Sequence, residues 1–225
     1  MLNKIGVIGG GFIGGVLVQE IAQRRLSREV GLTDPAPFVN PNDPEEKQAA
    51  TRKQSVAKGK TLEIAEGLPT LRSEVKVYGS RDYYAIEGAD LIIKTTGVPR
   101  KAKPDGTFPT REELLSINLK VTNQVAEGIR QNCPDATIIS IANPLDAIVY
   151  TINKRLNPPK NKLMGMAGVL DSGRYCYFVA EAANVSVENV NAMVLGGHGD
   201  TMVPVRSSCL IAGVPVSKFL DDETL

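Results

Sequence analysis

His198 is the only histidine in the chain, and its neighbours make it a candidate proton carrier. Gly197 and Gly199 stand on either side of it, just after a strand predicted over 190–195. Such surroundings make a poor core but leave space for a substrate to approach the ring. An unperturbed imidazole titrates near neutrality, which suits proton exchange with an alcohol or a ketone. The alternative is a structural or surface histidine, which is the commoner role of a lone histidine.

A second candidate site lies near the N-terminus, where Gly9, Gly11 and Gly14 form a G-x-G-x-x-G motif between a predicted strand and a predicted helix. The first glycine allows a tight turn, the second lets the backbone approach a pyrophosphate, and the third lets the helix pack on the strand. Phe12 and Ile13 open the helix, whose free N–H groups favour phosphates. The motif therefore predicts a dinucleotide site, with a flexible glycine turn as the alternative.

Asp34 ends the second predicted strand, over 30–34, and lies about 20 residues beyond the glycine motif. A carboxylate at this place can accept hydrogen bonds from both hydroxyls of an adenosine ribose. It would repel a 2′-phosphate, so the sequence favours NAD over NADP. The alternative is an exposed turn residue in front of Pro35.

The composition is that of an ordinary globular protein, with 42% apolar and 23% charged residues among 225. A formal charge of +1 gives no reason to expect nucleic acid or an anionic membrane as partner. No apolar run approaches the roughly 20 residues that a membrane helix needs. The 3 cysteines lie far apart without a CxxC pair, which indicates reduced thiols in a cytoplasmic protein. We expect no metal site.

The first half of the chain alternates strand-like and helix-like segments, which predicts an α/β fold with a parallel sheet and crossover helices. The predicted strands cover 4–9, 30–34, 75–78, 89–95 and 136–141, and the predicted helices cover 12–25, 59–66 and 111–132. A further helix is predicted near 171–183. We expect a doubly wound sheet of the Rossmann type over 1–144 and a second, α+β domain over 145–225.

Taken together, these motifs resemble those of the malate/lactate dehydrogenase family. In chain order they are the glycine motif, the segments 96–101, 111–114 and 141–144, the segment 165–174 with its Leu-Asp-Ser-Gly-Arg, and His198-Gly199-Asp200. The resemblance covers essentially the whole chain, and several independent motifs in one order are hard to obtain by chance. It implies an NAD domain followed by a substrate domain, and hydride transfer between a 2-hydroxy acid and the nicotinamide.

The resemblance implies that His198 is the catalytic base. Asp171 would accept a hydrogen bond from the distal imidazole nitrogen and stabilise the imidazolium; on sequence alone it could equally cap the following helix. Arg174 lies on the same helical face and would bind the C1 carboxylate of the substrate in a bidentate fork. The alternative for Arg174 is a surface ion pair.

The same resemblance implies residues around the nicotinamide. Asn143 would bind substrate and position the nicotinamide, although Asn before Pro is also a common turn. Thr96, Gly97, Asn118 and Ile141 are implied to border the cofactor.

The choice between malate and lactate rests on Arg100. An arginine at this position resembles malate dehydrogenases, whereas lactate dehydrogenases typically carry glutamine. Its fork can pair with the second carboxylate of oxaloacetate, a charge that a methyl group leaves unmatched. Arg111 would polarise the carbonyl group. The alternative is that both arginines belong to a basic, solvated loop; lactate or another 2-hydroxy acid is the alternative substrate.

Three features depart from the family pattern: the loop 101–110 and the segment 35–58 are expanded, and the chain stops after the acidic run 221–225. Family members continue through further helices and strands. We therefore expect a truncated chain with a partial substrate domain, and an inactive NAD-binding fragment is a further hypothesis. A homodimer or homotetramer is the expected assembly.

Overall fold

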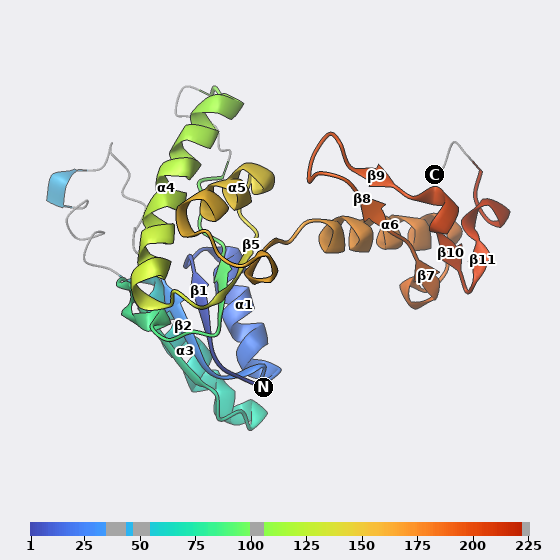
Figure 1. Cartoon of the computed structure of the whole chain (residues 1–225). Helices are drawn as coiled ribbons and strands as arrows, with labels where there is room; N and C mark the ends of the chain where they lie inside the picture. The colour runs from blue at the N-terminus through green and yellow to red at the C-terminus, as the bar shows by residue number, and fades with distance from the viewer. Residues whose placement is uncertain (35–43, 47–54, 100–105, 222–225) are drawn as a thin grey trace. The chain divides into compact units, whose positions relative to one another are not determined.

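The computed structural model describes residues 1–34, 44–46, 55–99 and 106–221. The chain divides into two compact units, Met1–Gly165 and Met166–Leu225 (Figure 1). Strands do not pair between the two units among the described residues, so each unit is described by itself.

The first unit is built on a six-stranded sheet in the order β3-β2-β1-β4-β5-β6, with every neighbouring pair parallel. Its strands are β1 (Leu2–Ile8), β2 (Ser27–Thr33), β3 (Lys76–Ser80), β4 (Leu91–Lys94), β5 (Thr137–Ser140) and β6 (Leu163–Gly165). The order reverses between β1 and β4, and ligands of such sheets bind at the carboxyl ends of the strands at that switch point. The predicted doubly wound sheet is confirmed.

Helices cover both faces of this sheet. They are α1 (Phe12–Gln23), α3 (Val56–Gly67), α4 (Arg111–Asn132) and α5 (Leu145–Leu156), with short 3₁₀ helices at Leu68–Leu71, Tyr83–Ile86 and Lys160–Lys162. Successive strand residues point to opposite faces, so Val7 packs in a core with Val18 of α1, whereas Ile8 packs in another with Ile129 and Ile152 of α4 and α5. No helix in the described ranges combines the length and apolarity that crossing a membrane requires.

The start of α4 shows how local sequence sets an element's bounds. The Thr110 hydroxyl accepts a hydrogen bond from the Glu113 N–H at 3.1 Å, and the Glu113 carboxylate accepts one from the Thr110 N–H at 3.0 Å. This reciprocal capping box satisfies N–H groups that the first turn leaves free. The helix predicted over 111–132 has these bounds in the structure.

The boundary predicted after residue 144 is wrong, because the first unit continues to Gly165. Helix α5 buries Ile148 and Ile152 in the same core as the α4 side of the sheet. Strand β6 then pairs parallel with β5, through Ile138 and Leu163 among others. Both elements therefore complete the first sheet and its covering layer.

The second unit contains α6 (Gly168–Ala183) and two small antiparallel sheets (Figure 1). One sheet joins β7 (Val190–Asn191), β10 (Leu210–Ile211) and β11 (Val214–Pro215); the other is the hairpin of β8 (Val194–Leu195) and β9 (Val203–Pro204). Short 3₁₀ helices cover Val187–Asn189, Arg206–Ser208 and Val216–Lys218. The single strand predicted over 190–195 is thus wrong: its two ends belong to different sheets.

Candidate active site

The second unit brings Asp171 and His198 into direct contact. Asp171 lies in the first turn of α6, and His198 lies in the loop between β8 and β9. Nδ1 of His198 is 2.8 Å from Oδ2 of Asp171, and the exposed fractions of the two side chains are 16% and 5%. The alternative that Asp171 caps the helix is wrong, because Ala167 occupies the N-cap position. The predicted contact is present, and its catalytic use stays a prediction.

Glycines shape the loop that carries His198. Gly196 has a φ of +95°, and a Cβ there would lie 2.3 Å from the Thr201 carbonyl oxygen. The Gly199 N–H donates to the Gly197 carbonyl at 3.0 Å, which tightens the backbone around the imidazole. At Gly199 a Cβ would meet nothing within 4 Å. One glycine is therefore required by the turn, while another leaves open space beside the ring.

Ser172 fastens this loop to the helix, and sequence reasoning missed it. Its hydroxyl accepts a hydrogen bond from the Val194 N–H, in β8, at 2.9 Å. Ser172 follows Asp171 directly, so α6 holds both the partner of the imidazole and the strand that leads to it. No spacing in the sequence pairs a helical serine with a valine 22 positions away.

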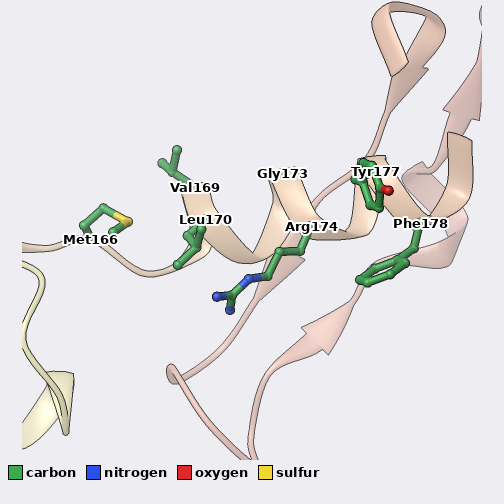
Figure 2. A pocket seen from close by; sticks show the side chains of 7 residues that line it. All are labelled: Met166, Val169, Leu170, Gly173, Arg174, Tyr177 and Phe178. Carbon is green, nitrogen blue, oxygen red and sulfur yellow. The ribbon is translucent and has the colours of Figure 1, made fainter. Parts of the chain in front are cut away.

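Arg174 lies beside the same carboxylate. Its NH1 is 3.7 Å from Oδ1 of Asp171, while 62% of the Arg174 side chain is exposed. Figure 2 shows its guanidinium extending along a hollow on α6. The hollow is lined by Met166, Val169, Leu170, Gly173, Arg174, Tyr177 and Phe178. The predicted ion pair is therefore present, and most of the Arg174 side chain stays exposed.

The glycine motif has the geometry that a pyrophosphate loop needs. Gly9 has a φ of +121°, and a Cβ on Gly14 would lie 1.8 Å from the Gly9 carbonyl oxygen. At Gly11 a Cβ would meet nothing within 4 Å, so the backbone there is open to a ligand. Phe12 and Ile13 are exposed at the start of α1. The turn and the close helix packing are as predicted.

Asp34 lies against the glycine motif, which excludes an exposed turn residue. A Cβ on Gly10 would lie 2.7 Å from Oδ2 of Asp34, and the Gly10 N–H donates to this carboxylate. Burial raises the pKa of the Asp34 carboxyl, against the opposing effects of that N–H and of the cations Lys60 and Arg81. The side chain is half-buried at the end of β2 and faces the loop.

Lys60 is a second residue that sequence reasoning missed. It reaches from α3 to the glycine motif, where its Nζ donates to the Gly11 carbonyl at 2.8 Å. A cation at this loop adds to the attraction that a helix N-terminus exerts on phosphate. The sequence shows only a lysine on a polar helix, and nothing in its spacing points to Gly11.

The residues predicted around the nicotinamide meet at the ends of β4 and β5. Asn118 is buried; its Oδ1 accepts from the Val98 N–H at 2.7 Å, and its Nδ2 donates to the Asn143 carbonyl at 3.0 Å. A Cβ on Gly97 would lie 3.4 Å from that of Ala142. Asn118 thus ties the two loops together with its amide engaged by backbone, and its place beside a cofactor stays a prediction.

The remaining predicted site residues make few contacts that bear on the site, or lie outside the described residues. The Thr96 N–H donates to the Ile8 carbonyl at 3.0 Å. Ile141 directly follows the last residue of β5, and its N–H donates to the Lys94 carbonyl at 3.0 Å. Arg100 lies outside the described residues, and Arg111 is described only as the first residue of α4. Within the described ranges, no group of His, Cys, Asp and Glu side chains is placed to hold a metal ion.

Comparison with known protein families covers nearly the whole chain. Residues 3–165 match the family described as lactate/malate dehydrogenase, NAD binding domain. Residues 168–224 match the lactate/malate dehydrogenase, alpha/beta C-terminal domain. These spans agree with the two compact units.

Known relatives show the same pattern. The chain is 44% identical over 219 residues to a malate dehydrogenase of Geotalea uraniireducens (strain Rf4), covering 97% of this chain and 62% of the relative. The solved malate dehydrogenase of Salinibacter ruber is 34% identical with a TM-score of 0.80, covering 98% of this chain and 63% of that one. A lactate dehydrogenase of Cryptosporidium parvum, solved with lactic acid and nicotinamide adenine dinucleotide, is 36% identical with a TM-score of 0.81, covering 100% and 64%.

Proposed function

Because this chain belongs to the lactate/malate dehydrogenase family, we propose that it catalyses reversible hydride transfer between a 2-hydroxy acid and NAD, with (S)-malate and oxaloacetate as the substrate pair. One observation carries the proposal: the buried Asp171 carboxylate contacts Nδ1 of His198 and lies beside the Arg174 guanidinium. This oxidation needs a base, a group that orients the base, and a cation that binds a carboxylate.

The residues of the first unit fit the cofactor. The open backbone at Gly11 would face the pyrophosphate, and the Lys60 ammonium beside it supplies a positive charge. The Asp34 carboxylate would accept hydrogen bonds from the ribose hydroxyls. NAD held by these residues would supply the hydride acceptor for C2 of the hydroxy acid. NAD in the Cryptosporidium lactate dehydrogenase supports this cofactor.

The contact between Asp171 and Nδ1 supports Nε2 of His198 as the proton carrier. Nδ1 of His198 is engaged by Asp171, so Nε2 takes the hydroxyl proton during oxidation and returns it to the carbonyl oxygen during reduction. The Asp171 carboxylate keeps the neutral ring in the tautomer protonated on Nδ1 and stabilises the imidazolium. Arg174 pairs with the C1 carboxylate of the substrate.

Malate is the proposed hydroxy acid because of Arg100 and the 44% identity to a malate dehydrogenase. Arg100 would bind the second carboxylate, Arg111 would polarise the carbonyl group, and Asn143 would contact the substrate. Lactate is the second candidate, since a lactate dehydrogenase is 36% identical over the whole chain.

Initial rates with NADH and either oxaloacetate or pyruvate test the proposal, with His198→Asn as the diagnostic variant. We expect the wild type to reduce oxaloacetate. The variant should do so about 10²–10⁴-fold more slowly, because general acid–base catalysis contributes that much. NADH binding, followed by its fluorescence, should be unchanged. Faster turnover of pyruvate would favour the lactate alternative. If the wild type binds NADH but turns over neither substrate, the proposed dehydrogenase activity is contradicted and only cofactor binding remains supported.

The compartment and the assembly are also proposals. We infer a cytoplasmic protein from its free thiols, Cys133, Cys176 and Cys209, which suit a reducing compartment. A homodimer or homotetramer follows from the family resemblance alone. Light scattering after size-exclusion chromatography distinguishes these two assemblies from a monomer.

A further inference from the structure

Lys94 is a buried lysine that the proposed mechanism does not use. It is the last residue of β4, at the centre of the sheet, and its exposed fraction is 0%. Lysine is almost never fully buried unless it is paired. Its Nζ donates a hydrogen bond to the Thr96 carbonyl at 2.7 Å. Burial lowers the pKa of the Lys94 amine to about 8.

The surroundings of Lys94 hold no opposite charge among the described residues. It is in register with Ile8 of β1 and Ser140 of β5, so these side chains lie on the face that α4 and α5 cover. Every described charged side chain on those two helices is exposed: Glu112, Glu113, Lys120, Glu127, Arg130, Asp146, Lys154 and Arg155. Tyr83, which packs against the same core, is uncharged, since burial raises its pKa to about 12.

Two hydroxyls near Lys94 lack partners as well. The buried Oγ of Ser140 and the buried Oγ1 of Thr96 have no hydrogen-bond partner within the described ranges. Buried polar atoms are normally satisfied. Among the described residues, the end of β4 therefore combines an ammonium without a counter-ion and polar atoms without partners, at the edge of the sheet where ligands bind.

The topology relates this edge to one half of the dinucleotide. Folds of this kind contain two mononucleotide-binding halves, and the dinucleotide crosses from one to the other at the switch point. Asp34 and the glycine motif belong to the half formed by β1, β2 and β3. The other nucleoside, which carries the nicotinamide, therefore belongs with β4, β5 and β6. Lys94 ends the first strand of that half.

We infer that the Lys94 ammonium makes this site favour the reduced over the oxidised dinucleotide. This inference rests on the proposed function. The oxidised nicotinamide ring is a cation and the dihydronicotinamide ring is neutral, so only the former is repelled. For an assumed separation of about 10 Å and an effective dielectric constant of about 20, such a repulsion would weaken NAD⁺ binding by roughly tenfold. Lys94 is a specificity-determining residue that acts through its charge.

The preference should depend on pH in a defined direction. Below pH 8 the amine is charged and opposes binding of NAD⁺; as pH rises through that value, the charge and the repulsion disappear. Affinity for NAD⁺ should therefore rise with pH, while affinity for NADH changes little. The ratio of the NAD⁺ to the NADH dissociation constant should fall by roughly tenfold.

Equilibrium binding tests this inference without turnover. NADH is titrated by fluorescence and NAD⁺ by calorimetry, well below and well above pH 8, on the wild type and three variants. Lys94→Met should show a low ratio at both pH values, because the charge is gone. Lys94→Arg should show a high ratio at both, because arginine stays protonated. Lys120→Met, which removes an exposed lysine of α4, should behave as wild type.

The outcomes separate the inference from the function on which it rests. A wild-type ratio that does not change with pH overturns the inference, as does a pH-dependent ratio that persists in Lys94→Met. Failure of the wild type to bind either dinucleotide overturns the proposed function, and this inference with it. If Lys94→Met does not fold, the wild-type pH profile and Lys94→Arg decide the question.

Discussion

Oδ2 of Asp171 lies 2.8 Å from Nδ1 of His198, so the carboxylate fixes both the direction and the tautomer of the ring. Asp171→Asn keeps the shape but removes the charge that stabilises the imidazolium. We expect oxaloacetate reduction to slow by about 10²–10⁴-fold, the usual contribution of acid–base catalysis, with NADH binding unchanged. Stopped-flow turnover measures the effect, and Glu188→Gln, at an exposed site in the same unit, is the matched control. Turnover near the wild-type rate in Asp171→Asn would contradict the pairing.

Ser172→Ala should loosen the loop that carries His198. The substitution leaves the Val194 N–H without its 2.9 Å partner, which should lower the free energy of unfolding by about 1 kcal/mol. Turnover should fall as well, because the imidazole is held less firmly. Ser208→Ala removes an exposed hydroxyl hydrogen bond, to the Val205 carbonyl, elsewhere in this unit and should leave turnover unchanged. Equal turnover in the two variants would show that the Ser172 bond is merely structural.

Gly11→Ala should separate cofactor binding from folding. A Cβ at this position meets no protein atom within 4 Å, so the melting temperature should not change. NADH affinity should fall by at least tenfold, because the methyl group occupies the space that a pyrophosphate needs. Gly59→Ala, in α3 and equally free of contacts, is the control and should leave NADH affinity unchanged. Undiminished NADH binding by Gly11→Ala would place the pyrophosphate elsewhere.

Asp34→Asn should relax the choice between NAD and NADP. The wild-type carboxylate repels a 2′-phosphate, and the amide does not. The nearby cations Lys60 and Arg81 then become available to that phosphate. We expect the ratio of kcat/KM with NADH to kcat/KM with NADPH to fall by at least tenfold. The control Glu66→Gln, at an exposed site on α3, should keep the wild-type ratio. A wild-type kcat/KM with NADPH that equals or exceeds the value with NADH would refute the role assigned to Asp34.

Arg100→Gln should shift preference from oxaloacetate toward pyruvate. Loss of a buried charge-assisted pair costs about 2–5 kcal/mol, which is roughly a 30- to 5,000-fold loss of kcat/KM for the dicarboxylate. Steady-state rates with both substrates measure the shift. If the variant keeps its kcat/KM for oxaloacetate, Lys101 or Lys103 is the better candidate for binding the second carboxylate, and Lys101→Gln and Lys103→Gln test them.

The sequence predicted the features that neighbouring residues decide. The helix over 111–132 has its predicted bounds because Thr110 and Glu113 cap it locally. The glycine motif predicted the turn correctly, because a side chain at Gly9 or Gly14 would collide with neighbouring atoms. The alternating strands and helices likewise predicted the doubly wound sheet, since periodicity reports which face of each element is buried.

Contacts between distant segments were decided by the tertiary structure alone. Helix α5 joined the first unit because Ile148 packs in the core of its sheet, a choice that its own amphipathic pattern leaves open. Lys60 reaches Gly11 across 49 positions, and Ser172 meets Val194 across 22. Lys94 looks like a polar interruption of an apolar strand, and its complete burial follows from its place at the centre of the sheet. Sequence determines local conformation because its causes lie within a few residues; burial and charge environment depend on which surfaces meet.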